Sequence, residues 1–384
     1  MRILAIEPIA VSLPMKKPVQ MAGETVARAA NVLVRIEAGD GVIGWGEAAS
    51  APVMTGETVA SMMAAVKHMT SGLLGRSADD FAGAAAAMNA QMYGNSGAKA
   101  AIEIALHDLV GRATGRPVYA LLGGKQRSRM PVLAVIGSED ALADLREAAA
   151  RRAAGYRAFK IKVGLGTPQA DAERTRSLCA ALKTQDHRRQ DGGRLVSADA
   201  NQGFGVDEAL HYVRALGDCG LDFFEQPIDA RNLDVGYFET MARVAAATPI
   251  AIGADEGIHS QGDIERHHAH KAARGVSLKA IKLGGLRAVL DACRLADRLG
   301  MRVNISCKTG ESSVASAAAA HVAAAAPAIA WGLTVTSPGL AEDVAVEPLR
   351  IDNGHVEVPE RPGLGIEVDE RRVRRCQQEF KRVA

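Results

Sequence analysis

The sequence contains little cysteine and almost no net charge, and each shortage argues against a class of protein. Its 384 residues include five cysteines, an odd number that offers no CxxC pair. This pattern disfavours a disulfide framework and favours the reducing cytoplasm. The formal net charge is +2, and no run of Lys and Arg is long enough to indicate a nucleic-acid partner. We therefore expect a cytoplasmic protein that binds no nucleic acid.

The chain also lacks a recognisable secretory or membrane segment. Its first residues, MRILAIEPIAVSLPMKK, alternate in polarity and include charges, which predicts a β-strand rather than a signal peptide. The longest apolar run, SSVASAAAAHVAAAAPAIAWGL (312–333), is mostly alanine and includes His321 and Pro327. We interpret it as a buried helix followed by a strand, and we expect no membrane partner.

From about Met130 onward, short apolar segments alternate with helical patterns along the chain. Repeated strand–helix units predict a (β/α)8 barrel, a modified TIM barrel. A doubly wound sheet also alternates, but no Gly-rich dinucleotide fingerprint follows the first strand. The eight candidate strands are MPVLAVIG (130–137), AFKIKVG (158–164), RLVSADAN (194–201), LDFFEQP (221–227), PIAIGADE (249–256), VSLKAIKLGG (276–285), RVNISC (302–307) and IAWGLTVT (329–336).

The first part of the chain has a different pattern. The segment ANVLVRIEAGDGVIGWGEAA (30–49) predicts two strands joined by an AGDG turn, and three helical patterns follow it. We predict an α+β capping domain over residues 1–128 and the catalytic barrel over 129–351. The C-terminal segment, 352–384, lies past the eighth strand, and we expect it to pack back on the capping domain and complete it.

Polar residues follow the barrel strands at the ends where barrel active sites are found. Asp199, Glu225 and Asp255 end three successive strands, and three carboxylates in one place would repel each other. A hard divalent cation with oxygen ligands removes this repulsion, so we predict a site for Mg²⁺, with Mn²⁺ as a possible substitute. Asn201 and Glu256 are expected to orient these ligands.

Lysines occur beside these carboxylates on two strands. Lys160 and Lys162 are two residues apart and therefore lie on one face of the second strand, while Lys279 lies on the sixth strand, opposite in the ring. A substrate between them would meet a lysine on each side. We expect Lys282 to point outward or toward the next helix, and we leave it out of the site. RHHAH (266–270) looks like a metal cluster, but a solvated helix face is the better interpretation.

At these residues the chain resembles the enolase superfamily, specifically its muconate-lactonizing subgroup within the mandelate racemase/muconate lactonizing enzyme family. The resemblance covers nearly the whole chain. It is carried by these segments, in order: GVIGWGEAA, GAKAAIEIALHDLVGRATGRPVYALLGG, FKIKVG, SADANQGF, FFEQP, IGADE, SLKAIKLGG and GHVEVPERPGLGI. The resemblance implies metal ligands at Asp199, Glu225 and Asp255, and acid/base lysines at Lys162 and Lys279.

Further site residues follow from the same resemblance. Lys160 would support Lys162, and Glu311 looks like the family's strand-seven glutamate. The approach to that glutamate departs from the family, since SCKTGESS stands where an MxE-like segment is common. It adds Lys308, which either binds a second carboxylate of the substrate or lies on the surface, and we favour the surface.

The resemblance implies an isomerase, either a racemase/epimerase or a cycloisomerase, acting on a small carboxylate substrate. A lysine would remove the proton next to the carboxylate, and the metal would stabilise the resulting enediolate. Such a lysine must be neutral, and burial, the charge of Lys160 and the metal would lower its pKa. A dehydratase of a hydroxy acid would use the same residues. A Schiff-base lyase and a non-catalytic barrel are remoter alternatives.

Substrate specificity is expected from two loops of the capping domain that close over the barrel, residues 13–30 and 49–58. They contain Lys16, Lys17 and Met54 but no aromatic residue, which favours a small or anionic substrate. Ser337 and Asp343, after the eighth strand, are further polar candidates. The lengthened segment 183–194 is expected on the bottom face of the barrel. Members of the family often form homo-oligomers, and we expect the same here.

Overall fold

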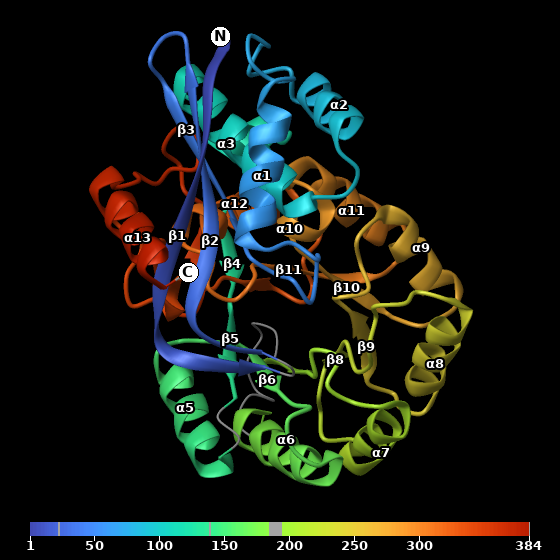
Figure 1. The fold of residues 1–384 in the computed structure, drawn as a ribbon. Helices are drawn as coiled ribbons and strands as arrows, with labels where there is room; N and C mark the ends of the chain where they lie inside the picture. Colours follow the sequence, from blue (N-terminus) through green and yellow to red (C-terminus); the bar gives the residue numbers. More distant parts are fainter. Residues whose placement is uncertain (22–23, 138–139, 184–193, 384) are drawn as a thin grey trace.

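Eight strands of the alternating region pair in parallel in the order β12-β11-β10-β9-β8-β7-β6-β5. A parallel bridge between Val132 and Leu333 joins the two ends of this sheet, so it is nearly closed into the predicted barrel. The computed structural model describes residues 1–21, 24–137, 140–183 and 194–383 (Figure 1). The barrel strands are β5 (Leu133–Ile136), β6 (Ala158–Lys162), β7 (Leu195–Asp199), β8 (Phe223–Glu225), β9 (Ala251–Ala254), β10 (Gly275–Leu278), β11 (Arg302–Ser306) and β12 (Leu333–Thr334).

Helices surround this ring because each barrel strand is followed by an amphipathic segment. In α11, for example, Leu286, Val289, Leu290 and Cys293 are buried at helical spacing. The lengthened segment predicted over 183–194 falls largely outside the described residues. The helices of this region are α5 (Ala141–Ala153), α6 (Pro168–Lys183), α7 (Val206–Leu216), α8 (Val235–Ala246), α9 (Gln261–Ala269), α10 (Ala280–Leu283), α11 (Leu286–Arg298), α12 (Ser313–Ala325) and the 3-10 turn η1 (Ser337–Gly339).

Helix α12 is the alanine-rich run, and it is buried on nearly every side. It precedes β12, so the prediction of a buried helix followed by a strand is confirmed. Small side chains suit this position, because α12 contacts both the barrel strand β11 and the N-terminal strand β3. None of the helices in the described part of the chain combines the length and apolar character needed to cross a bilayer.

The N-terminal region is an antiparallel sheet covered by helices (Figure 1). Gly44 and Gly46 on its third strand allow α3 to approach closely, since a Cβ on either would lie 2.2 Å from Ala105 O or 1.9 Å from Ala101 O. The elements are β1 (Ile3–Met21), β2 (Glu24–Ala38), β3 (Ile43–Ala49), α1 (Val59–Thr70), α2 (Phe81–Gln91), α3 (Ser96–Thr114) and α4 (Val118–Leu121).

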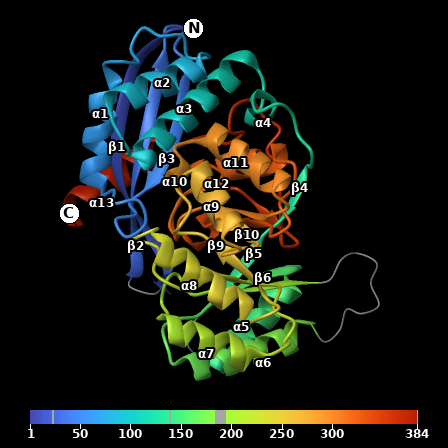
Figure 2. The same ribbon diagram turned by 90° about the vertical axis from the view of Figure 1, so that its right-hand side faces the viewer.

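The β1–β2 hairpin extends beyond β3 toward the barrel strands, as Figures 1 and 2 show. The pairing runs from Ile3 opposite Ala38 to Met21 opposite Glu24, and its register shifts between Ile3 and Ala5 and between Pro14 and Val19. Residues 13–30, which we expected to be a loop, are therefore mostly strand where the structure describes them. Backbone pairing with a neighbour, which the sequence pattern alone did not reveal, stabilises this arm.

The C-terminal segment contacts the N-terminal region. Strand β14 (His355–Glu357) pairs with β4 (Arg129–Pro131) on one side and with β13 (Ile351–Asp352) on the other. Helix α13 (Glu370–Val383) lies against β1. Leu364 N also donates to Asp108 on α3 at 2.8 Å. The division of the chain at residues 128 and 351 remains our prediction.

Candidate active site

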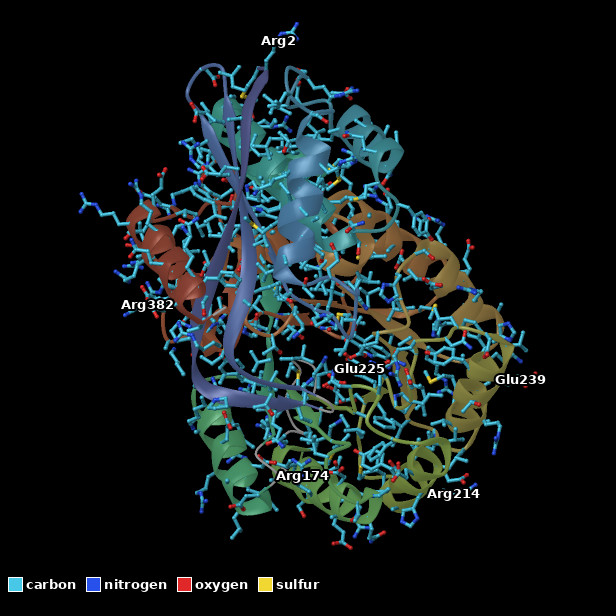
Figure 3. All side chains as sticks on the ribbon, viewed as in Figure 1. Arg2, Arg174, Arg214, Glu225, Glu239 and Arg382 are labelled. Atoms are coloured by element: carbon cyan, nitrogen blue, oxygen red, sulfur yellow. The ribbon has the colours of Figure 1, made fainter. Side chains whose placement is uncertain are left out.

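Three carboxylates stand at the ends of neighbouring barrel strands. Asp199 ends β7, Glu225 ends β8 and Asp255 directly follows β9, and the ladder pairs Asp199 with Glu225. Figure 3 places Glu225 inside the ring of strands, whereas Arg214 and Glu239 project from the outer helices. All three carboxylates are at least 98% buried. The structure therefore brings the predicted ligand set to one end of the barrel interior.

The two lysines of β6 contact these carboxylates. Lys160 Nζ lies 2.9 and 2.8 Å from the two carboxylate oxygens of Glu225 and 3.7 Å from Asp199 Oδ2. Lys162 Nζ donates to Asp199 Oδ2 at 2.7 Å and to Asn201 Oδ1 at 2.5 Å. The even spacing places both side chains in the barrel interior, as predicted. Phe159 and Ile161, between and beside them, belong to the apolar core instead.

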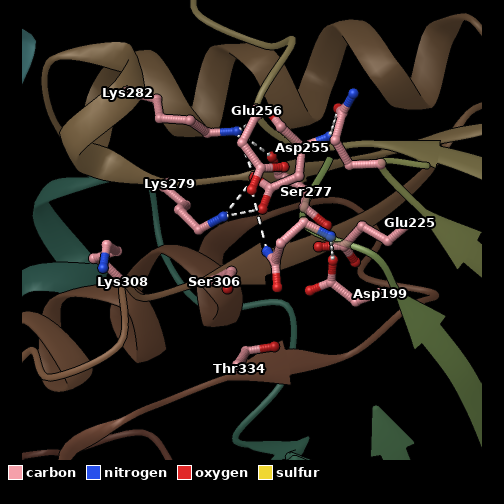
Figure 4. A network of polar contacts seen from close by, with 12 residues as sticks. Asp199, Glu225, Asp255, Glu256, Ser277, Lys279, Lys282, Ser306, Lys308 and Thr334 are labelled. Atoms are coloured by element: carbon pink, nitrogen blue, oxygen red, sulfur yellow. Dashed lines mark hydrogen bonds and ion pairs between the residues drawn. The ribbon is translucent and has the colours of Figure 1, made fainter. Parts of the chain in front are cut away.

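Two lysines that follow β10, Lys279 and Lys282, both contact Asp255 (Figure 4). Lys279 Nζ bonds both carboxylate oxygens. Lys282 Nζ lies 2.6 Å from Asp255 Oδ1 and 3.0 Å from Ser277 O, and its side chain is 1% exposed. The prediction that Lys282 points outward is wrong. The strand ends at Leu278 and helix α10 begins two residues later, so three-residue spacing brings both lysines to one side.

These contacts govern the charge state of the buried groups. Burial by itself raises the pKa of Asp255, but Lys279 and Lys282 outweigh it and hold that pKa below its usual range. Burial also raises the pKa of Glu225, and the opposing charge of Lys160 does not fully offset the rise. Burial lowers the pKa of Lys279, but Asp255 more than compensates, so the net shift is upward. This shift is opposite to the one a lysine base needs, so the carboxylate charge must be neutralised before Lys279 can act as a base.

The donor set suits a hard divalent cation. The set consists of carboxylate oxygens at three adjacent strand ends, and oxygen donors of this kind are those Mg²⁺ prefers. Lys160 Nζ already neutralises two carboxylates at once, since it contacts Glu225 and Asp199. Within the described residues, no three acidic, His or Cys side chains are already arranged around one point, because each carboxylate is turned toward a lysine. A cation bound by Asp199, Glu225 and Asp255 would therefore compete with these ion pairs.

Asn201 and Glu256 form a second layer beside these groups. Asn201 N donates to Asp199 Oδ1 at 2.9 Å, and Asn201 Nδ2 donates to Glu256 Oε1 at 3.1 Å. Burial and the nearby charges of Asp255 and Asp199 raise the pKa of Glu256 to about 7. The structure thus places both residues where we expected them to orient the ligands, and that role remains a prediction.

Glu311 and Lys308 lie after β11, next to the capping domain. Glu311 Oε2 accepts from Lys308 N at 2.8 Å, and Oε1 lies 3.5 Å from Ala49 N. Burial, with the neighbouring Glu47 as the second cause, raises the pKa of Glu311 to about 8. Lys308 is 5% exposed, so our preference for a surface position is wrong. Strand β2 covers this segment, which no local pattern could indicate.

The capping-domain candidates lie at different depths. Lys16 and Lys17 are exposed, and Lys16 Nζ donates to Pro338 O at 2.9 Å. Met54 packs against the apolar core of the capping domain. Ser337 is buried, and its Oγ has no hydrogen-bond partner among the described residues. Asp343 accepts from Ser313 Oγ at 2.8 Å and from Ala345 N at 2.9 Å, so it stabilises local structure.

The RHHAH segment contains one buried histidine rather than a solvated face throughout. His267 is 0% exposed; its Nε2 lies 3.0 Å from the Tyr237 hydroxyl, and its Nδ1 lies 2.7 Å from Asp263 O. His268 and His270 are exposed, as expected. The segment ends α9, and only one of its helix faces packs against α8.

Two residues without an assigned role in the sequence interpretation take part in the structure around the site. Gln226, which follows Glu225, is buried, and its Oε1 accepts from Asp255 N at 2.9 Å. Glu47 of the GWGE segment accepts from Ser312 Oγ at 2.6 Å. Both lie in segments that carry the family resemblance, which was the available signal, but their partners are distant in sequence.

Known proteins are similar to this chain over nearly its whole length. The family model described as "Enolase C-terminal domain-like" matches residues 144–372. The family model described as "Mandelate racemase / muconate lactonizing enzyme, N-terminal domain" matches residues 5–123. Chloromuconate cycloisomerase CbnB of Cupriavidus necator is 31% identical, over 97% of this chain and 98% of that protein. N-succinyl-L-Arg/Lys racemase of Bacillus cereus is also 31% identical, over 96% of each chain. L-Ala-D/L-Glu epimerase of Clostridium acetobutylicum is 32% identical, over 93% and 96%.

Solved structures agree with these similarities. The Bacillus cereus N-succinyl Arg/Lys racemase superposes with a TM-score of 0.89 at 30% identity, covering 98% of both chains. A muconate lactonizing enzyme from Pseudomonas fluorescens, complexed with muconolactone, superposes with a TM-score of 0.90 at 30% identity. That match covers 98% of this chain and 99% of the other. The similarity therefore includes both the barrel and the region that covers it.

Proposed function

The chain belongs to the mandelate racemase/muconate lactonizing enzyme family of the enolase superfamily, and from this premise we propose that it is a Mg²⁺-dependent isomerase of a small carboxylate substrate. It is a racemase, an epimerase or a cycloisomerase. One observation carries the proposal: three buried carboxylates at adjacent strand ends lie between two pairs of lysines. The named relatives are cycloisomerases, racemases and epimerases, which supports the same reaction class.

Asp199, Glu225 and Asp255 would hold the metal, with Asn201 and Glu256 orienting them. When bound, Mg²⁺ or Mn²⁺ would stabilise the negative charge that develops on the substrate carboxylate after proton removal. Neutralising these carboxylates also weakens their ion pairs with the lysines. That change favours the neutral lysine that proton abstraction needs.

Lys162 and Lys279 are the proposed acid/base residues. In the strand order, three strands separate β6 from β10 in each direction around the ring, so the two lysines approach a central substrate from opposite sides. Proton removal by one lysine and return by the other inverts the carbon next to the carboxylate. Lys160, bonded to Glu225, would support Lys162 by keeping a positive charge beside it.

Dehydration of a hydroxy acid is the second candidate. A leaving hydroxyl group needs a proton donor, and the raised pKa of Glu311, about 8 because of burial and Glu47, leaves its acid form populated near neutral pH. The same lysine would remove the adjacent proton. The two reactions therefore differ in whether water is lost.

We also propose a cytoplasmic location and a homo-oligomeric state. All five cysteines are free thiols, which supports a reducing compartment. The expected partner is a small-molecule carboxylate, and the names of relatives suggest which acids to test first: muconate-derived lactones, N-succinyl amino acids and dipeptides.

The test is a screen for proton exchange in D₂O with Mg²⁺, using those acids and a set of hydroxy acids. Mass spectrometry would follow deuterium incorporation and loss of water, which separates isomerase from dehydratase. We expect exchange with at least one acid. EDTA should abolish it, and Lys162→Ala should abolish it for the enantiomer whose proton Lys162 removes. The matched control is Lys183→Ala, because Lys183 pairs with Asp222 outside the site. Exchange that survives EDTA, or wild-type exchange of both enantiomers in Lys162→Ala, would contradict the proposal.

A further inference from the structure

A carboxylate of the capping domain completes the start of a barrel helix. Glu47 is the fifth residue of β3 and is fully buried. Its two oxygens each lie 3.0 Å from Ser312 N, and Oε2 also accepts from Ser312 Oγ at 2.6 Å and from Ala315 N at 3.1 Å. Helix α12 begins at Ser313, so these amides belong to its first turn. A carboxylate there satisfies open amides and interacts favourably with the helix dipole.

The capping domain also holds the residues just before this helix. Asn31 Nδ2 donates to Glu47 Oε1 at 2.7 Å and to Gly310 O at 2.9 Å. Gly310 has a φ of +91°, and a Cβ there would lie 2.3 Å from the Cβ of Ala29. Strands β2 and β3 therefore contact the segment 308–312 directly. We call these five residues the strand-seven segment.

The opposite side of the strand-seven segment is held by the barrel. Thr336 Oγ1 donates to Lys308 O at 2.8 Å and to Glu311 O at 3.1 Å. The backbone that carries Lys308 and Glu311 is thus fixed from both sides. The barrel side is local to β11 and β12, whereas Glu47 is more than 260 positions away in the sequence. Removing the Glu47 carboxylate would therefore release the strand-seven segment only on the side that faces the capping domain.

A second carboxylate of the capping domain makes the same kind of contact. Glu103 on α3 accepts from Arg287 N at 3.2 Å and from Leu286 N, at the start of α11. The residue preceding α11 is Gly285, which has no side chain to cap the helix. The capping domain therefore caps two barrel helices, one after Lys279 and Lys282 and one after Glu311. This repetition argues that the contacts at Glu47 are part of how the two regions fit together.

We propose that Glu47 is a positioning residue, which holds the strand-seven segment so that Glu311 and Lys308 stand correctly at the barrel mouth. The inference rests on the proposed function and adds to it one residue of the capping domain that positions groups of the site. Glu47 touches no lysine or ligand of the site in the described residues. It acts directly on Ser312, and through Asn31 on Gly310 O.

Glu47 also influences the protonation of Glu311. The groups that face Glu311 are Glu47 from β3, Lys308 from its own segment and the Cys307 thiol. Burial raises the pKa of Glu311, and the charge of Glu47 raises it further. Glu47→Gln removes that charge, so the pKa of Glu311 falls and its acid form is lost at a lower pH. A purely structural contact would leave this pH dependence unchanged.

Asp108 is a matched control. It is a fully buried carboxylate of the capping domain that accepts from Trp45 N at 2.9 Å, Leu364 N at 2.8 Å and Arg112 Nε at 2.9 Å. Its contacts connect the capping domain with the C-terminal segment, away from the strand-seven segment. Asp108→Asn therefore removes a comparable buried charge without releasing the site.

The first experiment needs no substrate and uses amide hydrogen exchange of the full chain. A hydrogen bond to a charged group is worth about 1.5–3 kcal/mol, so Glu47→Gln should speed exchange over residues 308–315 by roughly tenfold to a hundredfold. Asp108→Asn should leave that region protected. Glu47→Asp, which keeps the charge, should give intermediate protection and serves if the Gln variant does not fold. Wild-type protection over 308–315 in both Glu47 variants would overturn the inference.

The second experiment uses the acid that the wild type exchanges fastest in the D₂O screen. Glu47→Gln should lower kcat/KM at least tenfold and move the alkaline limb of its pH dependence to lower pH. Glu47→Asp should restore part of both effects. Asp108→Asn should keep the wild-type pH dependence of kcat/KM. An unchanged profile in Glu47→Gln would overturn the inference and leave the proposed function intact. If the wild type exchanges no acid, the proposed function fails, and hydrogen exchange still decides the role of Glu47.

Discussion

Lys160 and Lys162 on β6 stand across the barrel from Lys279 and Lys282 on the β10 side, and the two pairs are constructed differently. The β6 pair follows from strand geometry alone, since residues two apart share a face. The β10 pair needs a strand that ends at Leu278 and a helical turn that begins at Ala280. A regular pattern is visible in a sequence, whereas a change of secondary structure between two residues is not.

The pairs also differ in how they distribute charge. Lys162 bonds Asp199, and Lys160 bonds Glu225 and lies 3.7 Å from Asp199. Both lysines of the β10 pair bond Asp255. Burial raises the pKa of all these carboxyls, and the double pairing reverses the effect at Asp255, whereas the one close lysine at Glu225 does not. Each side thus combines a proposed acid/base lysine with a supporting one, but the balance of charge is unequal.

The largest expected effect comes from removing the acid/base lysine of each pair. Lys162→Ala and Lys279→Ala should each lower proton exchange by about 10²–10⁴-fold, and each should affect the opposite enantiomer of the substrate. The measurement is deuterium incorporation in D₂O from each enantiomer separately. If one variant exchanges both enantiomers at the wild-type rate, the reaction uses a single base and the functional symmetry of the pairs is lost.

The supporting lysines should differ in their effect on stability. Removing one partner of a buried ion pair costs about 3–5 kcal/mol, so Lys160→Met should lower the free energy of unfolding by about that amount. Lys282→Met should cost less, because Lys279 still bonds Asp255. Urea denaturation with EDTA measures both, and added Mg²⁺ should reduce both losses by binding the released carboxylates. An equal or larger loss in Lys282→Met would contradict this account of the two pairs.

Glu311 bonds neither lysine pair. Its pKa is raised, whereas that of Asp255 in the β10 pair is lowered, so the two groups change stability with pH in opposite directions. Burial and Glu47 raise its pKa from 4.5 to about 8, so the folded state binds a proton that the unfolded state releases. The stabilising contribution is complete below pH 4.5 and is lost as the pH rises through 8. Relative to Glu311→Gln, the wild type should lose a few kcal/mol across this range, since one pKa unit is worth about 1.4 kcal/mol. Parallel stability curves for the two proteins would contradict the assignment.

The smallest effect is expected at Lys16, which is exposed and bonds only Pro338 O in the described residues. Exposed contacts of this kind are worth about 0–1 kcal/mol. Lys16→Ala should therefore lower the free energy of unfolding by no more than about that amount, and it should change KM less than fivefold. Thermal unfolding and initial rates measure the two quantities. A large rise in KM would show that the hairpin arm contributes charge to the substrate site, beyond the two lysine pairs.

Local rules accounted for much of the fold and of the site. The eight strand segments, the buried alanine-rich helix and the N-terminal strands all followed from periodicity. The extended hairpin arm did not, because residues 13–21 and 24–30 are stabilised by pairing across the hairpin rather than by a local pattern. His267 was misjudged for the same reason, since its burial depends on α8.

By itself, the sequence determined the barrel, the three carboxylates at its strand ends and the Lys160–Lys162 pair. These features depend on the periodicity of a strand and on where each strand ends, which neighbouring residues decide. The tertiary structure alone decided that Lys282 turns onto Asp255, that Lys308 is buried and that Glu47 caps α12. Each of these depends on which distant segment covers a residue, and burial and charge pairing are properties of contacts between segments far apart in the chain.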